Sequence, residues 1–323
     1  MTRPLIRSAL IAIALLAGLF AVGTPAGAGG LDAGAMSLEE LRREPIRLEL
    51  DIPYAATDNP RQRLDLYLPK TPGSDRLPVI VFFHGGGWLW GDKADGAAQL
   101  MPFVREGRYA GISVGYRLSG EAIWPAQIHD SKAAIRWIRA HAGKYGLDPG
   151  RIAAWGRSAG AHLALMLGVS GDVPELEGDV GPHEGVSSRV CGVVNYFGVT
   201  EIPSLIGLPG DIDRSSPMAP EALLIGGVLT DNFEKARAAS PTTYVSPGDP
   251  PVLTIHGTAD PTVPYDQALR LDHALNRAGV PSYFITVRGA GHGGFPAEAQ
   301  DRVRAFFSKV LLGEDAAVPT GTL

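Results

Sequence analysis

Two serines lie at the centre of a Gly-x-Ser-x-Gly pattern, the frame in which a serine hydroxyl can act as a nucleophile. They are Ser113, in GISVG, and Ser158, in GRSAG. The chemistry needs a strand that ends in a tight turn and opens a helix, because that turn exposes the serine oxygen above the edge of a sheet. Ser158 follows a strand-like run and precedes an apolar helical run, whereas Ser113 lies inside a strand-like run. The context predicts Ser158 as the nucleophile and Ser113 as a strand serine.

A serine hydroxyl needs a general base, and the sequence holds eight histidines. We predict that the base is His292, in GAGHGGF, because this loop follows the last predicted strand at the end of the sheet where such sites form. His256, at the end of a strand, is the strongest competitor, and His162 is expected to pack beneath the serine turn. Less well placed, beside or within helices or in a loop, are His129, His141, His183 and His273.

The base in turn needs an acid that holds its tautomer and stabilises the imidazolium. Asp260, in HGTADP, comes just after a predicted strand, so Ser158, Asp260 and His292 follow successive strand ends. The plainer interpretation of Asp260 is an Asp-Pro turn residue. Asp266 is the alternative acid, although it is expected inside the next helix.

A glycine-rich segment, HGGGW at 84–88, follows another predicted strand. Glycines let backbone N–H groups turn toward the carbonyl oxygen that becomes negative in acyl transfer. We predict an oxyanion hole formed by the N–H groups of Gly86, Gly87 and Ala159. A plain turn is the alternative. A phosphate-binding loop is excluded, because this segment is not followed by the Lys and the Ser or Thr that such a loop requires.

The surrounding elements alternate in a regular way. The segments 46–52 and 64–68 alternate apolar and polar residues, which predicts an antiparallel pair of half-exposed strands. Continuous apolar runs, which predict strands buried on both faces, follow at 79–83, 112–114, 152–155, 190–197, 252–255 and 283–287. Helix-length stretches lie between or after them at 131–141, 159–169, 265–278 and 297–312. This order predicts an α/β domain over residues 46–312, with a mainly parallel sheet of eight strands.

Three segments fall outside the alternation. Residues 198–247 hold several prolines and glycines and only short helical patterns, which predicts a small cap or lid insertion. Residues 313–323 are small and polar, which predicts a flexible tail. Residues 1–28 resemble a signal peptide, with two arginines, an apolar run over 9–22 and the small residues Ala26-Gly27-Ala28. A second possible cleavage site follows Ala35. The rival interpretation of this segment is a membrane anchor. It is disfavoured because the apolar run is shorter than the ~20 residues that span a bilayer.

Composition excludes several classes of protein. The 323 residues are 45% hydrophobic and 20% charged, which fits a globular chain with a large core. One cysteine, Cys191, excludes an internal disulfide framework and a multi-cysteine zinc site. A net charge of -5 gives no basic field for nucleic acid. We expect a secreted or periplasmic protein without metal or organic cofactor and without stable membrane insertion after cleavage.

Together these motifs resemble the α/β-hydrolase carboxylesterases of the HGGG(W) type, a group that includes hormone-sensitive-lipase-like and bacterial feruloyl and acetyl esterases. The likeness covers roughly residues 46–312 and also rests on LDLYLP at 64–69 and YGLDP at 145–149. It implies Ser158 as nucleophile, His292 as base, Asp260 as its partner and the loop after His84 as the oxyanion site. Arg157 departs from the pattern, since the group more often has Gly, Asp, Glu or Gln there; either a local salt bridge or a bias toward anionic esters would explain it.

The resemblance specifies the substrate less closely than the mechanism. An exported enzyme of this type is expected to act on short-chain or aromatic esters, free or linked to polysaccharides. Three tryptophans, Trp88, Trp90 and Trp124, are candidates for an aromatic wall, although packing is expected for at least two of them. A serine peptidase, an arylformamidase-type amide hydrolase and an inactive binding module on the same fold remain alternatives.

Overall fold

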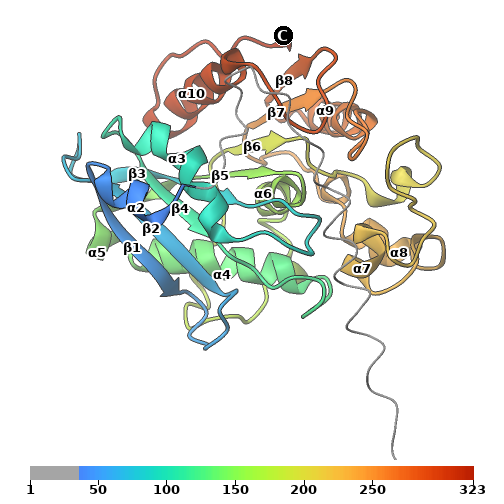
Figure 1. The fold of residues 1–323 in the computed structure, drawn as a ribbon, viewed down its shortest axis with the longest axis horizontal. Helices are drawn as coiled ribbons and strands as arrows, with labels where there is room; N and C mark the ends of the chain where they lie inside the picture. The colour runs from blue at the N-terminus through green and yellow to red at the C-terminus, as the bar shows by residue number, and fades with distance from the viewer. Residues whose placement is uncertain (1–35) are drawn as a thin grey trace, which may run out of the picture.

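The computed structural model describes residues 36–323 (Figure 1). The predicted signal peptide and both of its possible cleavage sites lie outside the described residues. The strands of the described part are β1 (Ile46–Pro53), β2 (Arg63–Pro69), β3 (Leu77–Phe83), β4 (Ala110–Val114), β5 (Leu147–Arg157), β6 (Val193–Tyr196), β7 (Val252–Gly257), β8 (Ser282–Val287) and β9 (Gly321–Thr322). The α-helices are α2 (Leu38–Arg43), α3 (Gly96–Val104), α4 (Ala126–Ala140), α5 (Ala142–Tyr145), α6 (Ala159–Val169), α7 (Pro220–Ile225), α8 (Phe233–Ala238), α9 (Asp266–Ala278) and α10 (Ala297–Leu312). None of the helices within residues 36–323 has the length and apolar character needed to cross a membrane.

All strands of the described part join one sheet in the order β1-β2-β4-β3-β5-β6-β7-β8-β9. β1 and β2 are antiparallel to each other, β2 is antiparallel to β4, and every pairing from β4 to β9 is parallel. The predicted α/β class and the antiparallel pair at the N-terminal edge are therefore confirmed. The strand order around β3, β4 and β5 places the glycine-rich segment after β3 directly beside the end of β5, where Ser158 lies.

The sheet is buried on both faces, as the continuous apolar runs predict. Along β3, Val79 and Val81 face one core, which they share with helices α4, α6 and α9. Ile80 and Phe82 face the other core, which they share with α3 and α10. Because side chains alternate across a strand, a run such as 79–83 must be apolar throughout to serve both cores.

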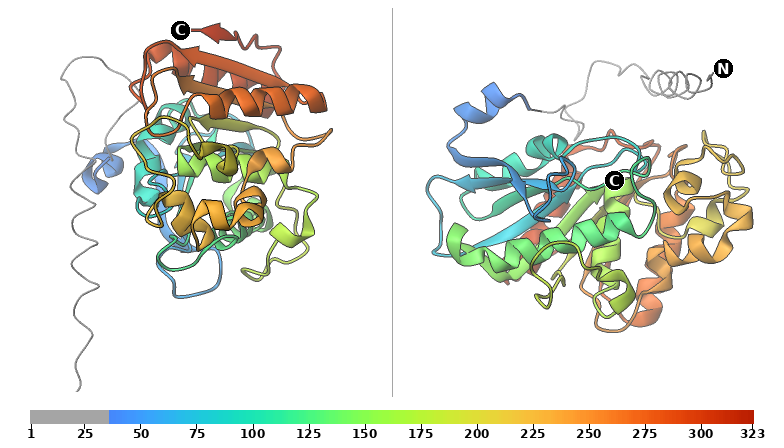
Figure 2. Two further views of the ribbon diagram at one scale, coloured as in Figure 1. Left: turned by 90° about the vertical axis from the view of Figure 1, so that its right-hand side faces the viewer. Right: turned by 90° about the horizontal axis from the view of Figure 1, so that it is seen from below.

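Residues 198–247 connect β6 to β7 and contain α7, α8 and three short 3₁₀ turns at 202–205, 229–231 and 241–243. Both Figure 1 and the right view of Figure 2 show α7 and α8 together at one end of the molecule. The segment is tied to the loop after β7, because the backbone N–H of Asp211 donates to the carbonyl of Pro261 at 2.9 Å. We call residues 198–247 the insertion.

The C-terminal tail differs from the prediction. Gly321–Thr322 forms β9, which pairs in parallel with β8 and makes the sheet nine-stranded instead of eight-stranded. Two further hydrogen bonds involve Leu323, whose N–H donates to Thr286 at 2.8 Å and whose carbonyl accepts from Arg288 at 2.9 Å. The expectation of a flexible tail is wrong for these residues, because a composition without apolar period gives no sign of backbone pairing at a sheet edge.

Candidate active site

The turn that carries Ser158 has the strained geometry that the Gly-x-Ser-x-Gly pattern predicts. Ser158 has a positive φ of 53° with ψ of -122°, and it stands between the last residue of β5 and the first of α6. Such a backbone is unfavourable for a residue with a side chain and is found mainly at functional turns. Gly160 is needed because a Cβ there would lie 2.1 Å from the carbonyl oxygen of Phe83. The turn therefore packs directly on the end of β3.

Ser113 lies in the middle of the sheet and not at a turn. It belongs to β4, it is fully buried, and its hydroxyl faces α3 beneath Gly96. The prediction of a strand serine is confirmed.

His292 and Asp260 are paired in the structure. Nδ1 of His292 donates to Oδ2 of Asp260 at 2.7 Å, so the carboxylate sets the imidazole tautomer with a hydrogen on Nδ1. The other carboxylate oxygen, Oδ1, accepts from the backbone N–H groups of Thr262 and Val263, each at 2.9 Å. Asp266, the alternative acid, is the first residue of α9 and pairs with Arg270.

His256 also contacts the acid, on the side away from the cavity. It is fully buried, its Nε2 donates to the carbonyl of Val263 at 2.9 Å, and the same nitrogen lies 3.2 Å from Oδ2 of Asp260. Burial raises the pKa of Asp260, but the hydrogen bonds from His256 and His292 outweigh that effect and hold the pKa well below its usual range. Asp260 is therefore ionised at neutral pH. Sequence reasoning placed His256 as a rival base and missed this supporting contact.

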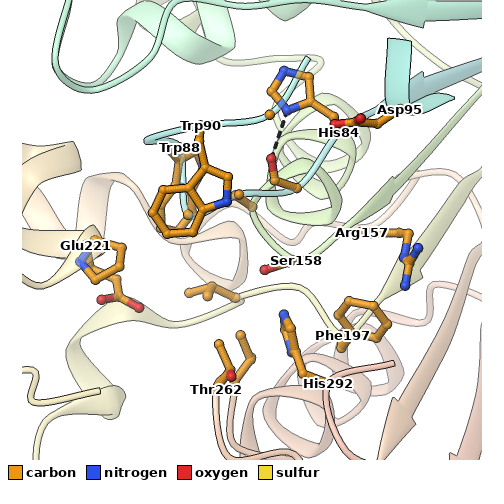
Figure 3. Close-up of a pocket in the computed structure, with 18 of the residues that line it drawn as sticks. His84, Trp88, Trp90, Asp95, Arg157, Ser158, Phe197, Glu221, Thr262 and His292 are labelled. Carbon is orange, nitrogen blue, oxygen red and sulfur yellow. Dashed lines mark hydrogen bonds between the residues drawn. The ribbon is translucent and has the colours of Figure 1, made fainter. Parts of the chain in front are cut away.

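Ser158 and His292 open into the same cavity, which has a volume of about 430 Å³. Figure 3 shows the Ser158 hydroxyl and the His292 ring pointing toward one another. Gly86 and Gly87 line the same cavity and have positive φ values of 107° and 59°. A side chain at Gly86 would collide with the backbone of Trp90, since its Cβ would lie 2.3 Å from that carbonyl oxygen.

Ala159 completes the group of predicted oxyanion donors. It also lines the cavity and is the first residue of α6. The N–H groups of the first turn of a helix have no acceptor within the helix, so they are directed toward whatever lies at its N-terminus. The three residues predicted as oxyanion donors thus line one cavity and come from two separate elements, the loop after β3 and the first turn of α6.

Beneath the serine turn, His162 is fully buried and packs against aromatic rings. Trp88 donates from Nε1 to Nδ1 of His162 at 3.3 Å, while Nε2 of His162 contacts the carbonyl of Ala239 at 2.7 Å. Since a carbonyl only accepts, the hydrogen must be on Nε2. Burial lowers the pKa of His162 to about 4, so the ring is neutral at pH 7. Its predicted packing role is confirmed.

The three tryptophans have different environments. Trp88 is buried and Trp124 is partly buried, and both pack edge-on against His162. Trp88 and Trp90 both line the cavity, but only Trp90 is exposed, at 43%. One of the three candidates for an aromatic wall therefore presents a large open ring to the mouth of the cavity.

Arg157 lines the cavity on the other side of Ser158 (Figure 3). Its guanidinium lies over the ring of Phe197, 5.4 Å from the ring centre, and Phe197 in turn packs 4.4 Å from the ring of His292. These contacts fix one face of the imidazole. Within residues 36–323, no cluster of three or more His, Cys, Asp or Glu side chains has the arrangement of a metal site.

The nine-stranded, mainly parallel sheet with a serine at the turn from β5 to α6 defines an α/β-hydrolase fold. The family model BD-FAE matches residues 64–275, and the chain belongs to this family. A solved structure described as a truncated carbohydrate esterase from gut microbiota is 33% identical over 82% of this chain and 96% of that chain, with a TM-score of 0.76.

Two curated relatives that the chain matches are also named esterases. Esterase LipC from Mycobacterium tuberculosis is 32% identical over 73% of this chain and 58% of its own length. Esterase LipQ from the same organism is 32% identical over 79% of this chain and 59% of its own length. The chain thus spans somewhat over half the length of these relatives.

Proposed function

We propose that this protein hydrolyses carboxylic esters through an acyl-enzyme intermediate on Ser158. The observation that carries the proposal is the 2.7 Å hydrogen bond from His292 to the ionised Asp260, beside a serine held in a strained turn at the same cavity. The names of the relatives, all esterases, support the same reaction class.

In the proposed mechanism, Nε2 of His292 takes the proton of the Ser158 hydroxyl as the oxygen attacks the ester carbonyl. Asp260 stabilises the imidazolium that forms, because its charge lies 2.7 Å from Nδ1. The N–H groups of Gly86, Gly87 and Ala159 bind the negative oxygen of the tetrahedral intermediate. His292 then protonates the departing alcohol, and water repeats the sequence to release the acid.

The size of the cavity favours small substrates. A volume of about 430 Å³ suits a short or aromatic acyl group better than a long alkyl chain. We propose acetyl-type or hydroxycinnamoyl-type esters, in keeping with the carbohydrate esterase of known structure to which the chain is similar. Activity on nitrophenyl esters of rising chain length tests this proposal: activity should fall steeply before about ten carbons, and a preference for longer chains contradicts it.

We also propose export, on the basis of the sequence pattern in residues 1–28. N-terminal sequencing of the protein recovered from the medium or periplasm of an expressing bacterium should find a chain that starts after Ala28 or Ala35. Recovery of the full-length chain in the cytoplasm alone contradicts the proposal.

The reaction itself is tested with Ser158→Ala, which should lower kcat for 4-nitrophenyl acetate by about 10⁶-fold, the loss seen when other triads lose their nucleophile. Ser113→Ala is the matched control and should keep activity. Faster cleavage of a peptide or formamide than of any ester favours the amide-hydrolase alternatives, and a wild-type protein inactive on every ester favours the binding module.

A further inference from the structure

Phe197 has a strained backbone, although no atom of it takes part in the mechanism above. It is the residue after β6, it is 2% exposed, and it lines the cavity with Ser158 and His292. Its φ is 43°, in the left-handed region that favours glycine. A residue with a side chain keeps such a backbone only where the surrounding structure holds it there, and such residues cluster at active sites. Phe197 is therefore a candidate for a role in the reaction.

Backbone hydrogen bonds tie the end of β6 to both neighbouring strands. The N–H of Ser158 donates to the carbonyl of Tyr196 at 2.9 Å. On the other side, the N–H of Phe197 donates to the carbonyl of Ile255, in β7, at 3.0 Å. β7 leads directly into the loop that carries Asp260. The backbone of Phe197 is thus held in a fixed place relative to the nucleophile and the acid.

The loop that carries His292 has few side chains of its own with which to pack. Four of its residues are glycines, at 289, 291, 293 and 294, and a Cβ at Gly289 or Gly291 would have nothing within 4 Å. The ring of Phe197 contacts this loop at two places, because its centre lies 4.4 Å from that of His292 and 5.4 Å from that of Phe295. Figure 3 shows the ring of Phe197 beside the ring of His292. Phe197 therefore supplies packing that the backbone of the loop does not.

The hydrogen bond to Asp260 does not by itself fix the angle of the His292 ring. It holds Nδ1 at 2.7 Å from the carboxylate, but the imidazole can still pivot about that contact, and its side chain is 23% exposed. We propose that Phe197 is a positioning residue: its ring holds the imidazole of His292 at the angle that directs Nε2 toward Ser158. This inference rests on the proposed esterase function and adds to it a residue that acts through the base.

The test uses the two tasks of His292 during acylation, which are to take the proton of Ser158 and to give it to the departing alcohol. The ester 4-nitrophenyl acetate needs only the first task, because 4-nitrophenolate is a stable anion that departs without a proton. The ester 4-nitrobenzyl acetate needs both, because its alcohol is a poor leaving group. The two esters share the acetyl group and the nitro-substituted ring, so the ratio of their kcat/KM values reports how well His292 delivers the proton.

We expect Phe197→Ala to lower kcat/KM by about a hundredfold for 4-nitrobenzyl acetate and by about tenfold for 4-nitrophenyl acetate, because a misplaced base costs more where it must act twice. The ratio of 4-nitrophenyl to 4-nitrobenzyl acetate should then rise by about tenfold. Phe197→Gly should give the same rise, since it also lacks the ring. Glycine accepts a φ of 43° without strain, so Phe197→Gly keeps the test available if Phe197→Ala does not fold.

The control is Phe307→Ala, which removes an equally large buried ring from α10, where it packs on Phe103 and Trp155. It should leave the ratio unchanged, because a ratio of two kcat/KM values does not depend on the amount of folded enzyme. A ratio that stays within about twofold of wild type in both Phe197 variants overturns the inference. So does a wild-type ratio in Phe197→Gly alone, because the ring would then not be needed. Both results leave the esterase proposal intact, whereas a wild type that hydrolyses neither ester overturns that proposal and this inference with it.

Discussion

Replacing Asp260 by Asn keeps the shape of the acid and removes its charge, and the structure indicates how the new amide must orient. The carboxylate accepts two backbone N–H bonds on Oδ1, and on Oδ2 it accepts the Nδ1–H of His292, with Nε2 of the buried His256 at 3.2 Å from the same oxygen. An amide has one oxygen, which is needed at the two backbone donors. Its NH₂ group then faces His292, where only an acceptor fits.

His292 can meet that NH₂ group only by moving its hydrogen from Nδ1 to Nε2. In that tautomer Nε2 cannot take the proton of Ser158. Losing a charge-assisted hydrogen bond (about 3 kcal/mol) and populating the wrong tautomer (about 2 kcal/mol more) together lower kcat by about 10⁴-fold. The same change in a serine protease triad costs about as much.

The assay is hydrolysis of 4-nitrophenyl acetate by wild type, Asp260→Asn and Asp266→Asn. Asp266 is partly exposed on α9 and pairs with Arg270, so Asp266→Asn should stay within about threefold of wild type. An Asp260→Asn enzyme that keeps more than a tenth of its activity, or a larger loss in Asp266→Asn, refutes the assignment of the acid.

Three further predictions concern stability. Gly160→Ala should lower the free energy of unfolding in urea by roughly 2–4 kcal/mol, because its Cβ would collide with backbone at 2.1 Å. The control is Gly143→Ala, because nothing lies within 4 Å of where that Cβ would be. Equal effects of the two substitutions contradict the packing argument. The pKa of His162 falls from 6.5 to about 4 on folding, so the unfolded chain takes up this proton first; the associated stability is fully present above pH 6.5 and lost as pH falls toward 4. The loss amounts to about 3 kcal/mol of the free energy of unfolding. Urea denaturation at pH 7 and pH 4.5 should therefore show a weaker pH dependence of this free energy in His162→Gln than in wild type. An equal pH dependence in the two proteins refutes the prediction. Deleting residues 319–323 should lower Tm by about 2–4 °C because β9 is lost; an unchanged Tm indicates a tail that does not pair.

The apolar pattern predicted the central sheet and three of its four long helices, α6, α9 and α10, well. Residues 159–169 and 297–312 were predicted as helices and are α6 and α10 with the same bounds. These segments have an unbroken apolar pattern, which burial against the sheet requires. The order of strand ends also placed Ser158, Asp260 and His292 together, since the carboxyl ends of parallel strands meet at one edge.

The apolar pattern missed the start of α4, helix α3 and one buried ion pair. Helix α4 begins at Ala126, five residues before the predicted start, because Asp130 is buried in hydrogen bonds with Gln62 and Arg117 instead of marking an exposed segment. Helix α3 escaped prediction because it contains Pro102. The buried pair of Arg214 and Glu221 gave no local signal, since neither residue type is expected in a core.

The most direct test of the account is covalent labelling of wild-type protein with a fluorophosphonate, followed by mass spectrometry of the digested chain. The account predicts one adduct, on the peptide that contains Ser158, and no adduct in Ser158→Ala or in wild type pretreated with a competing ester. Labelling of Ser113 or another residue, or ester hydrolysis that continues without labelling of Ser158, contradicts the account.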